Sequence, residues 1–210
     1  MQARLLYVMD PMCSWCWGFA PVLESLAEQA AAAGVGLKLV MGGLRRDGVA
    51  IDAAARVRYL GYWQAVNAST GQLFNFTAGL PEGLVYDTEP ACRALVTARS
   101  LAPERAWSLA QLIQRAFYTE GVDVTRASVL VELAERAGIA RIGFAEAFDS
   151  AAQRAATAAD VSWAQDLGIS GFPTLLAERN GQLALLTNGY QPLEVLQPLL
   201  ARWLERVAHA

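Results

Sequence analysis

The feature of this 210-residue sequence that most limits its fold is a pair of cysteines, Cys13 and Cys16, near the N-terminus. The run before them, residues 5–8, is apolar, rich in strand-forming residues and followed by an Asp-Pro dipeptide that stops strand pairing. After them, apolar residues recur at helical spacing up to a glycine-rich break, and a second apolar run covers residues 37–40. The pattern predicts a β-α-β unit in which the cysteines open the helix.

This position gives the two thiols different chemistry. Cysteines three residues apart on the first turn of a helix lie on one face, close enough to form a disulfide. We expect Cys13 at the exposed helix N-terminus, where unpaired N–H groups and the helix dipole favour a thiolate, and therefore expect it to be the nucleophile. Cys16, one turn further in and partly buried, is expected to attack the resulting mixed disulfide and release the substrate.

The same spacing also occurs in structural zinc sites and in inert cysteine pairs. A tetrahedral zinc site needs two further ligands, and only Cys92 and His209 are available. Since the sequence has no second closely spaced pair, redox chemistry is favoured and no metal is predicted. Cys92 is more simply a small buried hydrophobic residue, and the terminal position of His209 makes it a poor catalytic candidate.

The middle of the chain, residues 47–157, is almost wholly helical by pattern. Thr88 is expected to cap one helix, a second runs from Pro103 to Gly121, and a third covers Arg126 to Ala137.

The pattern returns to strands after Gly168. Apolar runs at residues 174–177 and 183–186 flank Asn180-Gly181, which is a strong hairpin signal, and an amphipathic helix then closes the chain. An α/β fold follows, in which strands at both ends of the sequence surround a helical middle.

Bulk properties exclude several functions. The net charge of −3, without any run of Lys or Arg, argues against nucleic-acid binding. Charged residues interrupt every apolar stretch before it reaches the roughly 18 residues that a membrane-spanning helix needs. The start of the sequence lacks the pattern of a secretory signal, so we expect a cytoplasmic protein, in which disulfides are usually transient or catalytic.

Two segments resemble one known family. Residues 10–19 (DPMCSWCWGF) resemble the active-site segment of DsbA-like thioredoxin-fold proteins, in particular the cytoplasmic FrnE-type branch of predicted disulfide isomerases or oxidoreductases. Residues 168–174 (GISGFPT) are similar to the loop that carries a cis-proline opposite the cysteines in this family. The resemblance implies a thioredoxin-like fold with a large inserted all-helical domain: residues 1–46 and 158–210 form the thioredoxin-like domain, and residues 47–157 form the insert.

The resemblance also implies roles for individual residues. Pro173 is expected in the cis form beside the thiols, with the Phe172 backbone able to pair with an extended substrate segment. From the residues themselves, Trp15, Met12 and Ser14 are further candidate substrate-binding residues, because an aromatic ring and a flexible thioether suit an apolar groove. Packing of the helix onto the sheet is the alternative role for Trp15.

The implied activity is that of a thiol-disulfide oxidoreductase or isomerase acting on protein or small-molecule disulfides, without a bound cofactor. Unlike many periplasmic relatives, this chain has no histidine between the cysteines. We therefore expect the Cys13 thiolate to depend mainly on the helix end, aided by a hydrogen bond from Ser14. The pattern leaves the oligomeric state and the direction of electron flow open.

Three further features bear on the function or on the roles of single residues. Residues 42–45 (GGLR) resemble a loop of this branch and also of kappa-class glutathione transferases and hydroxychromene carboxylate isomerases, which bind glutathione and use a serine first. A glutathione-dependent transferase or isomerase is therefore the alternative function, with glutathione as reductant or co-substrate; glycines at a tight turn explain the loop equally well. Asp10 is favoured as a turn former over a proton acceptor for Cys16, and Trp17 is expected in the core.

Overall fold

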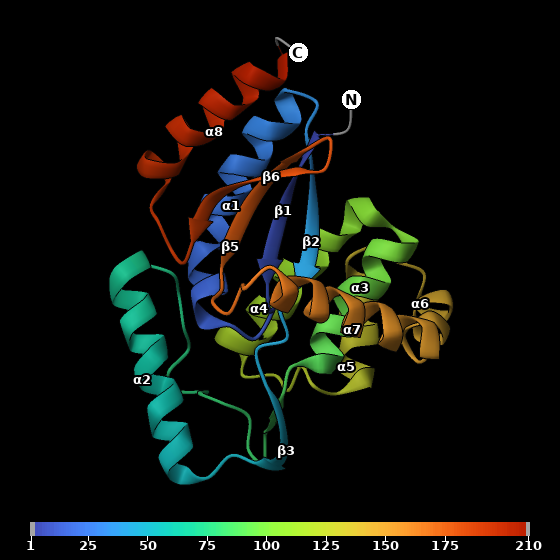
Figure 1. Cartoon of the computed structure of the whole chain (residues 1–210). Coiled ribbons are helices and arrows are strands. Elements are labelled where there is room, and N and C mark those ends of the chain that lie inside the picture. The colour runs from blue at the N-terminus through green and yellow to red at the C-terminus, as the bar shows by residue number, and fades with distance from the viewer. Residues whose placement is uncertain (1–2, 209–210) are drawn as a thin grey trace.

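A four-stranded mixed sheet runs through the centre of the molecule, in a computed structural model that describes residues 3–208 (Figure 1). The strand order is β2-β1-β5-β6; β1 and β2 are parallel, and β5 is antiparallel to both of its neighbours. The strands are β1 (Ala3–Met9), β2 (Gly36–Met41), β5 (Thr174–Arg179) and β6 (Gln182–Asn188).

The hairpin between β5 and β6 confirms the turn prediction. Asn180 and Gly181 have φ angles of 49° and 81°, in the left-handed region that a two-residue hairpin turn of this type requires. The predicted strands at residues 5–8 and 37–40 are likewise present, each slightly longer than its apolar run. His209 lies outside the described residues.

Helices cover both faces of the sheet (Figure 1). Leu5, Tyr7 and Met9 alternate along β1 and belong to the main core, which also contains buried residues of α1 and α8. Val8 points to the opposite face, where it packs with Val40 of β2 and with the C-terminal part of α7. These helices are α1 (Ser14–Ala32), α7 (Ala151–Asp166) and α8 (Leu193–Ala208).

The segment between β2 and β5 forms the expected helical insertion. In Figure 1, α2 stands beside the lower end of the sheet, whereas α3, α5 and α6 lie on the side of β2. A short 3-10 helix, η1, precedes α4. The helices of this segment, besides α7, are α2 (Ala53–Thr70), α3 (Glu89–Leu101), η1 (Pro103–Arg105), α4 (Ala106–Glu120), α5 (Ala127–Arg136) and α6 (Arg141–Phe148). The domain boundaries at residues 46/47 and 157/158 stay a prediction.

The insertion also contains a small sheet that the sequence pattern did not predict. Strands β3 (Arg46–Ala50) and β4 (Val85–Asp87) pair antiparallel across the whole of α2. Neither strand has an apolar run or a clear alternation, and their pairing joins segments far apart in the sequence. Such a sheet depends on tertiary contacts, which explains why local pattern favoured an almost wholly helical segment.

An ion pair fastens the insertion to the edge of the main sheet. Arg99 of α3 and Asp160 of α7 form a bidentate pair at 2.7 and 3.0 Å. The Asp160 carboxylate also accepts a hydrogen bond from the Met41 amide at 3.0 Å, and Arg99 donates to the Leu39 carbonyl oxygen. The pair thereby satisfies backbone groups at the open edge of β2 that no strand covers.

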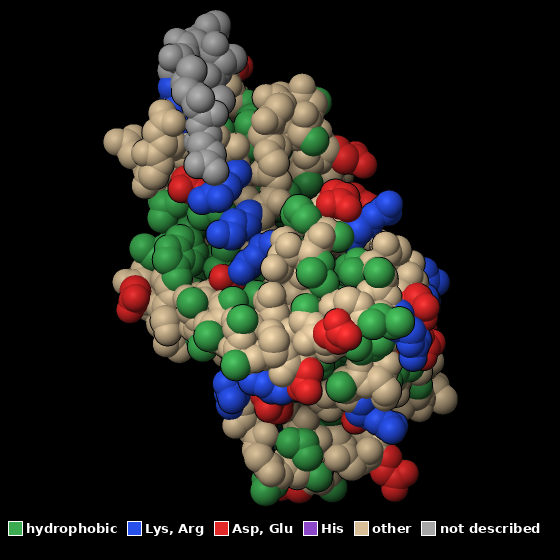
Figure 2. Space-filling view, turned by 90° about the vertical axis from the view of Figure 1, so that its right-hand side faces the viewer, with side chains coloured by type: hydrophobic (Ala, Val, Ile, Leu, Met, Phe, Trp, Pro, Cys, Tyr) green, Lys and Arg blue, Asp and Glu red, His purple; other side chains and the backbone are tan. Residues whose placement is uncertain are grey.

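Surface charge is mixed. Figure 2 shows acidic and basic side chains interspersed over the face made by the insertion, rather than gathered by sign. Over residues 3–208, the structure contains no helix with the length and apolar character needed to cross a bilayer.

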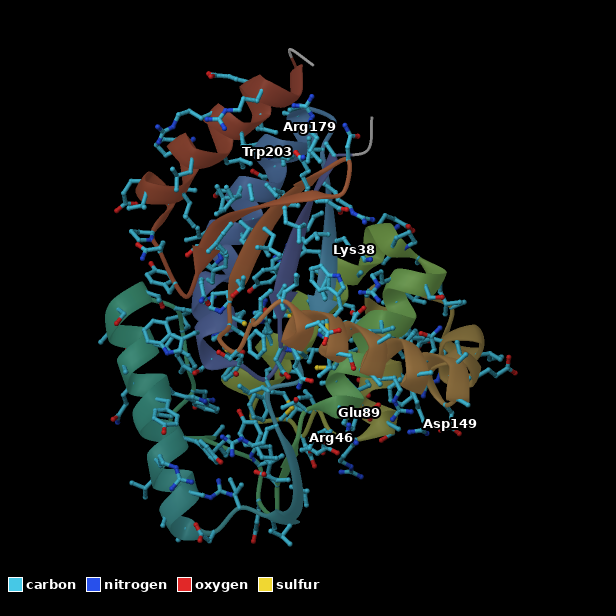
Figure 3. The ribbon with its side chains drawn as sticks, viewed as in Figure 1. Lys38, Arg46, Glu89, Asp149, Arg179 and Trp203 are labelled. Carbon is cyan, nitrogen blue, oxygen red and sulfur yellow. The ribbon has the colours of Figure 1, made fainter. Side chains whose placement is uncertain are left out.

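Substitution of Asp160 tests how far its contacts with Arg99 and Met41 stabilise the edge of β2. Replacing it with Ala leaves the Arg99 charge and the Met41 amide without their partner, so we expect a loss of about 2–3 kcal/mol in the free energy of unfolding. The control is Asp149→Ala, since Asp149 pairs with Arg154 but has a side chain 81% exposed, against 13% for Asp160 (Figure 3). We expect that control to cost about 0–1 kcal/mol. Equal losses in urea unfolding of the two variants would contradict this role.

Candidate active site

Cys13 and Cys16 lie where β1 gives way to α1, as predicted. Cys13 is the N-cap residue of α1, with extended backbone (φ −87°, ψ 117°), and its carbonyl oxygen accepts the first helical hydrogen bond, from Trp17, at 3.1 Å. The Cys13 amide donates to the Asp10 carbonyl oxygen at 3.0 Å, which closes the turn before the helix. The Cys13 sulfur therefore sits at the positive end of a 19-residue helix.

Both thiols are more buried than expected. Cys13 is only 6% exposed and Cys16 is fully buried, whereas the sequence predicted an exposed and a partly buried thiol. Phe172, whose carbonyl oxygen contacts the Cys13 sulfur, is 159 residues away in the sequence, and a local pattern does not reveal such a contact. Cys13, Cys16 and Cys92 are all free thiols in the structure.

Burial determines the protonation of Cys16. It raises the pKa of Cys16 well above its usual value, and the neighbouring Cys13 raises it further. The Asp10 backbone and the Tyr7 side chain lower the pKa of Cys16 in part, without reversing this rise. Cys16 is thus a neutral thiol at neutral pH, held among a small number of polar groups.

The loop before β5 faces Cys13. The Phe172–Pro173 peptide bond is cis, as the family resemblance implies. The Cys13 thiol donates a hydrogen bond to the Phe172 carbonyl oxygen at 3.6 Å, so this backbone lies beside the sulfur. The two predicted motifs therefore meet, although most of the chain separates them.

Gly42 and Gly43 allow Phe172 and Val161 to pack closely against the backbone that follows β2. A Cβ atom on Gly42 would lie 2.1 Å from the Phe172 ring, closer than any real contact. Gly43 has a φ of +67°, and a Cβ atom there would lie 2.8 Å from Val161. The positive φ that the turn interpretation requires is present at Gly43, whereas the reason for a glycine at position 42 is the close approach of Phe172.

A cavity of about 300 Å³ opens beside Cys13. Met12 is one of its lining residues but is fully buried, so it is enclosed rather than presented at the surface as a flexible groove residue would be. Ser14 and Trp15 are half-buried and line one side. The cavity is lined by Met12, Cys13, Ser14, Trp15, Leu44, Arg45, Tyr59, Tyr62, Trp63, Tyr86, Ser170, Gly171 and Phe172.

The aromatic wall of this cavity was missed by sequence reasoning. Tyr59, Tyr62 and Trp63 come from one face of α2, and Tyr86 comes from β4. Their spacing along α2 is a signal of a shared helical face, but nothing in it indicates that the face meets Cys13. The Tyr86 hydroxyl donates to the Met12 carbonyl oxygen at 2.8 Å and so joins this wall to the thiol loop, residues 10–13.

Arg45 brings a positive charge to the cavity. Its guanidinium carbon lies 5.0 Å and 5.5 Å from the ring centres of Tyr59 and Tyr86, and one of its nitrogens lies 3.5 Å from the Asp47 carboxylate. The buried Nε atom has no hydrogen-bond partner within the described residues. The cavity thus combines an aromatic surface, a thiol and a cation that has donor capacity left over.

Asp10 is the polar centre behind the thiols. Its buried carboxyl group accepts hydrogen bonds from the amides of Met12 and Leu44, both at 2.8 Å, from the Thr88 hydroxyl at 2.6 Å and from the Cys92 thiol at 3.3 Å. The bond to Met12 makes Asp10 a turn former, as favoured from sequence. Burial nevertheless raises the pKa of Asp10 above its ordinary 3.8, while the four donors oppose that shift.

Thr88 and Cys92 have different roles from those predicted. The helix begins after Thr88 as expected, but the Thr88 hydroxyl bonds Asp10 and makes no cap. The Asp87 carboxylate instead accepts from the Glu89 amide at 3.0 Å. Cys92 is buried as predicted, yet it is also a hydrogen-bond donor, and burial followed by the Asp10 charge raises the pKa of its thiol.

The two tryptophans of the motif are both half-buried. Trp15 contacts Tyr190, with ring centres 6.0 Å apart. Trp17 stacks on Tyr118 at 6.0 Å, but its indole N–H reaches outward to the Leu73 carbonyl oxygen at 2.8 Å, so the prediction of a core position is only half right. In residues 3–208, no group of three or more His, Cys, Asp or Glu side chains is arranged to hold a metal ion.

Comparison with known proteins identifies relatives of this chain. The profile of the DSBA-like thioredoxin domain matches residues 4–201. A candidate protein disulfide isomerase from Nitrosomonas europaea is 39% identical, with a TM-score of 0.90 over 98% of this chain and 99% of that one. The cytosolic disulfide reductase DsbM from Pseudomonas aeruginosa is 29% identical, with a TM-score of 0.79 over 99% of this chain and 100% of that one.

DsbM has also been solved with glutathione; that structure is 28% identical, with a TM-score of 0.76 over 99% of this chain and 100% of that one. A 2-hydroxychromene-2-carboxylate isomerase has a TM-score of 0.68 over 98% of each chain but is 16% identical, so it shows a shared fold alone. No curated protein sequence matches significantly.

The buried carboxyl group of Asp10 predicts a pH dependence of stability. Because its pKa is raised in the folded state, its contribution to the free energy of unfolding is largest below about pH 3.8 and falls as the pH rises through the raised pKa. Asp10→Asn removes this titration. We therefore expect the stability difference, wild type minus variant, measured by urea unfolding at several pH values, to decrease from acid towards neutral pH. A difference that is constant over this range would contradict the shift.

Proposed function

Since the chain belongs to the DsbA-like thioredoxin-domain family, we propose that it is a thiol-disulfide oxidoreductase whose dithiol is Cys13 and Cys16. The observation that carries the proposal is the Cys13 sulfur at the N-terminus of α1, 3.6 Å from the Phe172 carbonyl oxygen. A thiolate at a helix N-terminus is favoured by the dipole. The adjacent backbone offers an extended substrate segment a place to pair.

The reaction proceeds by two exchanges. The Cys13 thiolate attacks one sulfur of a substrate disulfide, forms a mixed disulfide and releases the other sulfur as a thiolate. Cys16 then loses its proton and attacks Cys13, which forms the Cys13–Cys16 disulfide and releases the second substrate thiolate. The substrate gains two electrons and the enzyme dithiol loses two; both released thiolates take up protons.

We propose that electrons flow from the enzyme to its substrates in a cytoplasmic setting. DsbM, at 29% identity, is a cytosolic disulfide reductase, and a glutathione-poised cytosol keeps dithiols reduced. The residues between the cysteines, Ser14 and Trp15, carry no charge that would stabilise the reduced form as strongly as in an oxidant. Reduction or isomerisation of disulfides therefore fits this site better than net oxidation.

We further propose glutathione as the reductant that restores the dithiol. A cavity of about 300 Å³ is of the size that takes a small molecule, and Arg45 has donor capacity suited to a carboxylate. One structure of DsbM, at 28% identity, contains glutathione. No bound cofactor is required in this scheme, because the electrons pass through sulfur alone.

Replacing Cys16 with Ser tests the assignment of the two thiols. We expect Cys16→Ser to accumulate covalent adducts with a disulfide-bonded protein such as insulin, because Cys13 still attacks and nothing resolves the product. Mass spectrometry and non-reducing electrophoresis measure the adducts. Cys92→Ser is the control and should reduce insulin as wild type does.

Two results would contradict the assignment. The first is the absence of adducts in Cys16→Ser together with no insulin reduction by wild type. The second is glutathione-dependent activity that persists unchanged in Cys16→Ser, which would favour the transferase or isomerase alternative.

Arg45→Gln tests the glutathione site. We expect the glutathione concentration that gives half-maximal reduction of the oxidised enzyme to rise about tenfold, because a charge-assisted hydrogen bond is lost. Arg46→Gln is the matched control, since the Arg46 side chain is 73% exposed, against 35% for Arg45, and pairs with Asp87 outside the cavity (Figure 3). An equal change in both variants, or none in Arg45→Gln, would exclude this role for Arg45.

A further inference from the structure

Pro21 lies inside α1 and removes one backbone hydrogen bond from that helix. A proline has no N–H, and its ring crowds the carbonyl group four residues earlier, which here belongs to Trp17. The Trp17 carbonyl oxygen therefore lacks its α-helical donor, in the residue that follows Cys16. The Gln72 side chain, from the segment after α2, donates to this oxygen through Nε2 at 3.0 Å. The insertion thus supplies a hydrogen bond that Pro21 prevents α1 from making.

Gln72 is itself bound to the C-terminal end of α2. Its backbone N–H donates to the Thr70 hydroxyl at 3.1 Å, and its carbonyl oxygen accepts from the Asn67 side chain at 2.8 Å. The next residue, Leu73, accepts a hydrogen bond from the Trp17 indole N–H at 2.8 Å. Two hydrogen bonds of opposite direction therefore join Trp17 to the segment that ends α2.

The same end of α2 packs closely against α1. A Cβ atom on Gly18 would lie 2.7 Å from Val66 Cγ1 and 3.0 Å from Thr70 Cγ2, so a larger residue there would push the two helices apart. Val66 and Thr70 lie at helical spacing from Tyr59 and Trp63, on one face of α2. Tyr59 and Trp63 line the active-site cavity. The position of α2 against α1 therefore sets the position of the aromatic wall.

We propose that Gln72 is a positioning residue, which holds the aromatic residues of α2 at the distance from Cys13 that glutathione binding requires. This inference rests on the proposed function, in which glutathione enters the cavity and restores the dithiol. Gln72 is not among the residues that line the cavity, so it acts through the position of α2. Its loss should weaken the binding of glutathione and leave the chemistry of the sulfur atoms unchanged.

Reduction by glutathione takes two exchanges, and only the binding of the reductant depends on Gln72. The first glutathione thiolate attacks Cys13, forms a mixed disulfide and releases Cys16 as a thiolate, which takes up a proton. A second glutathione thiolate attacks the glutathione sulfur of that mixed disulfide, which forms glutathione disulfide and releases the Cys13 thiolate. Two glutathione molecules thereby lose two electrons, and the enzyme disulfide gains them.

Gln72→Met tests this inference, because methionine keeps the length of the side chain and removes the N–H donor. The measurement is the rate at which a reductant restores free thiols in the oxidised protein, followed by timed alkylation. We expect the glutathione concentration that gives the half-maximal rate to rise about fivefold, since a hydrogen bond that holds α2 is lost. The rate constant for dithiothreitol, a smaller reductant that reports on the disulfide itself, should stay within about twofold.

Gln111→Met is the matched control. Gln111 also donates to α1 through its side-chain amide, to the Glu24 carboxylate at 3.3 Å, but it belongs to α4 and not to the segment that ends α2. We expect the values for both reductants to stay within about twofold of wild type.

Gly18→Ala displaces α2 by a second route, because the added methyl group would meet Val66 at 2.7 Å. We expect the half-maximal glutathione concentration to rise in this variant too. Gly18→Ala combined with Val66→Ala removes the opposing methyl groups and should recover most of the wild-type value. A rise that Val66→Ala does not reverse would contradict the role of α2 in binding glutathione.

The outcomes separate this inference from the proposed function. Saturation of wild type by glutathione, with an unchanged half-maximal concentration in Gln72→Met, would overturn the role of Gln72 alone. An equal loss with dithiothreitol, or an equal rise in Gln111→Met, would overturn it as well, because the effect would then not be specific to the cavity wall. If dithiothreitol reduces the oxidised wild type and glutathione does not, both the proposed glutathione site and this inference fail.

Discussion

The position of the thiols depends on a buried carboxyl group that has to be satisfied by the protein itself. Asp10 has no exposed surface, so water cannot solvate it, and its donors come from three separate segments. Met12 belongs to the thiol loop, Leu44 lies 34 residues from Asp10, and Thr88 lies 78 residues away at the start of α3. The loop of residues 10–13, the loop of residues 42–45 and the helical insertion therefore meet at one polar group. The orientation of α1 depends on all three.

The molecule divides its functional parts between the two ends and the middle of the chain. The β1-α1 unit supplies the thiols and the helix end, and the loop before β5 supplies the backbone beside Cys13. The insertion supplies the aromatic residues Tyr59, Tyr62 and Trp63 of the cavity wall. In the proposed scheme the reactive sulfur atoms thus come from the first helix, whereas the aromatic wall of the cavity beside Cys13 comes from the insertion.

Local features of the sequence predicted the local structure well. An apolar run followed by a C-x-x-C at a helical pattern was enough to place Cys13 at the N-cap, and Asn180-Gly181 was enough to place a hairpin. Burial of Cys13 was not predictable in this way, because the residues that line the cavity beside it come partly from α2, β4 and the loop at 170–172. The same limit explains the missed pairing of β3 with β4. Each of these features depends on which distant segments come into contact, and a local sequence pattern does not determine those contacts.

The contact between Gly42 and the Phe172 ring has a consequence for how this site can change. The ring occupies the space in which a side chain at position 42 would stand, 2.1 Å from the nearest ring atoms. The sizes of the residues at positions 42 and 172 are therefore coupled, because a side chain at position 42 fits only if the residue at position 172 is smaller than phenylalanine. Variation at Phe172, whose backbone lies beside Cys13, is in this way coupled to the residue that follows β2.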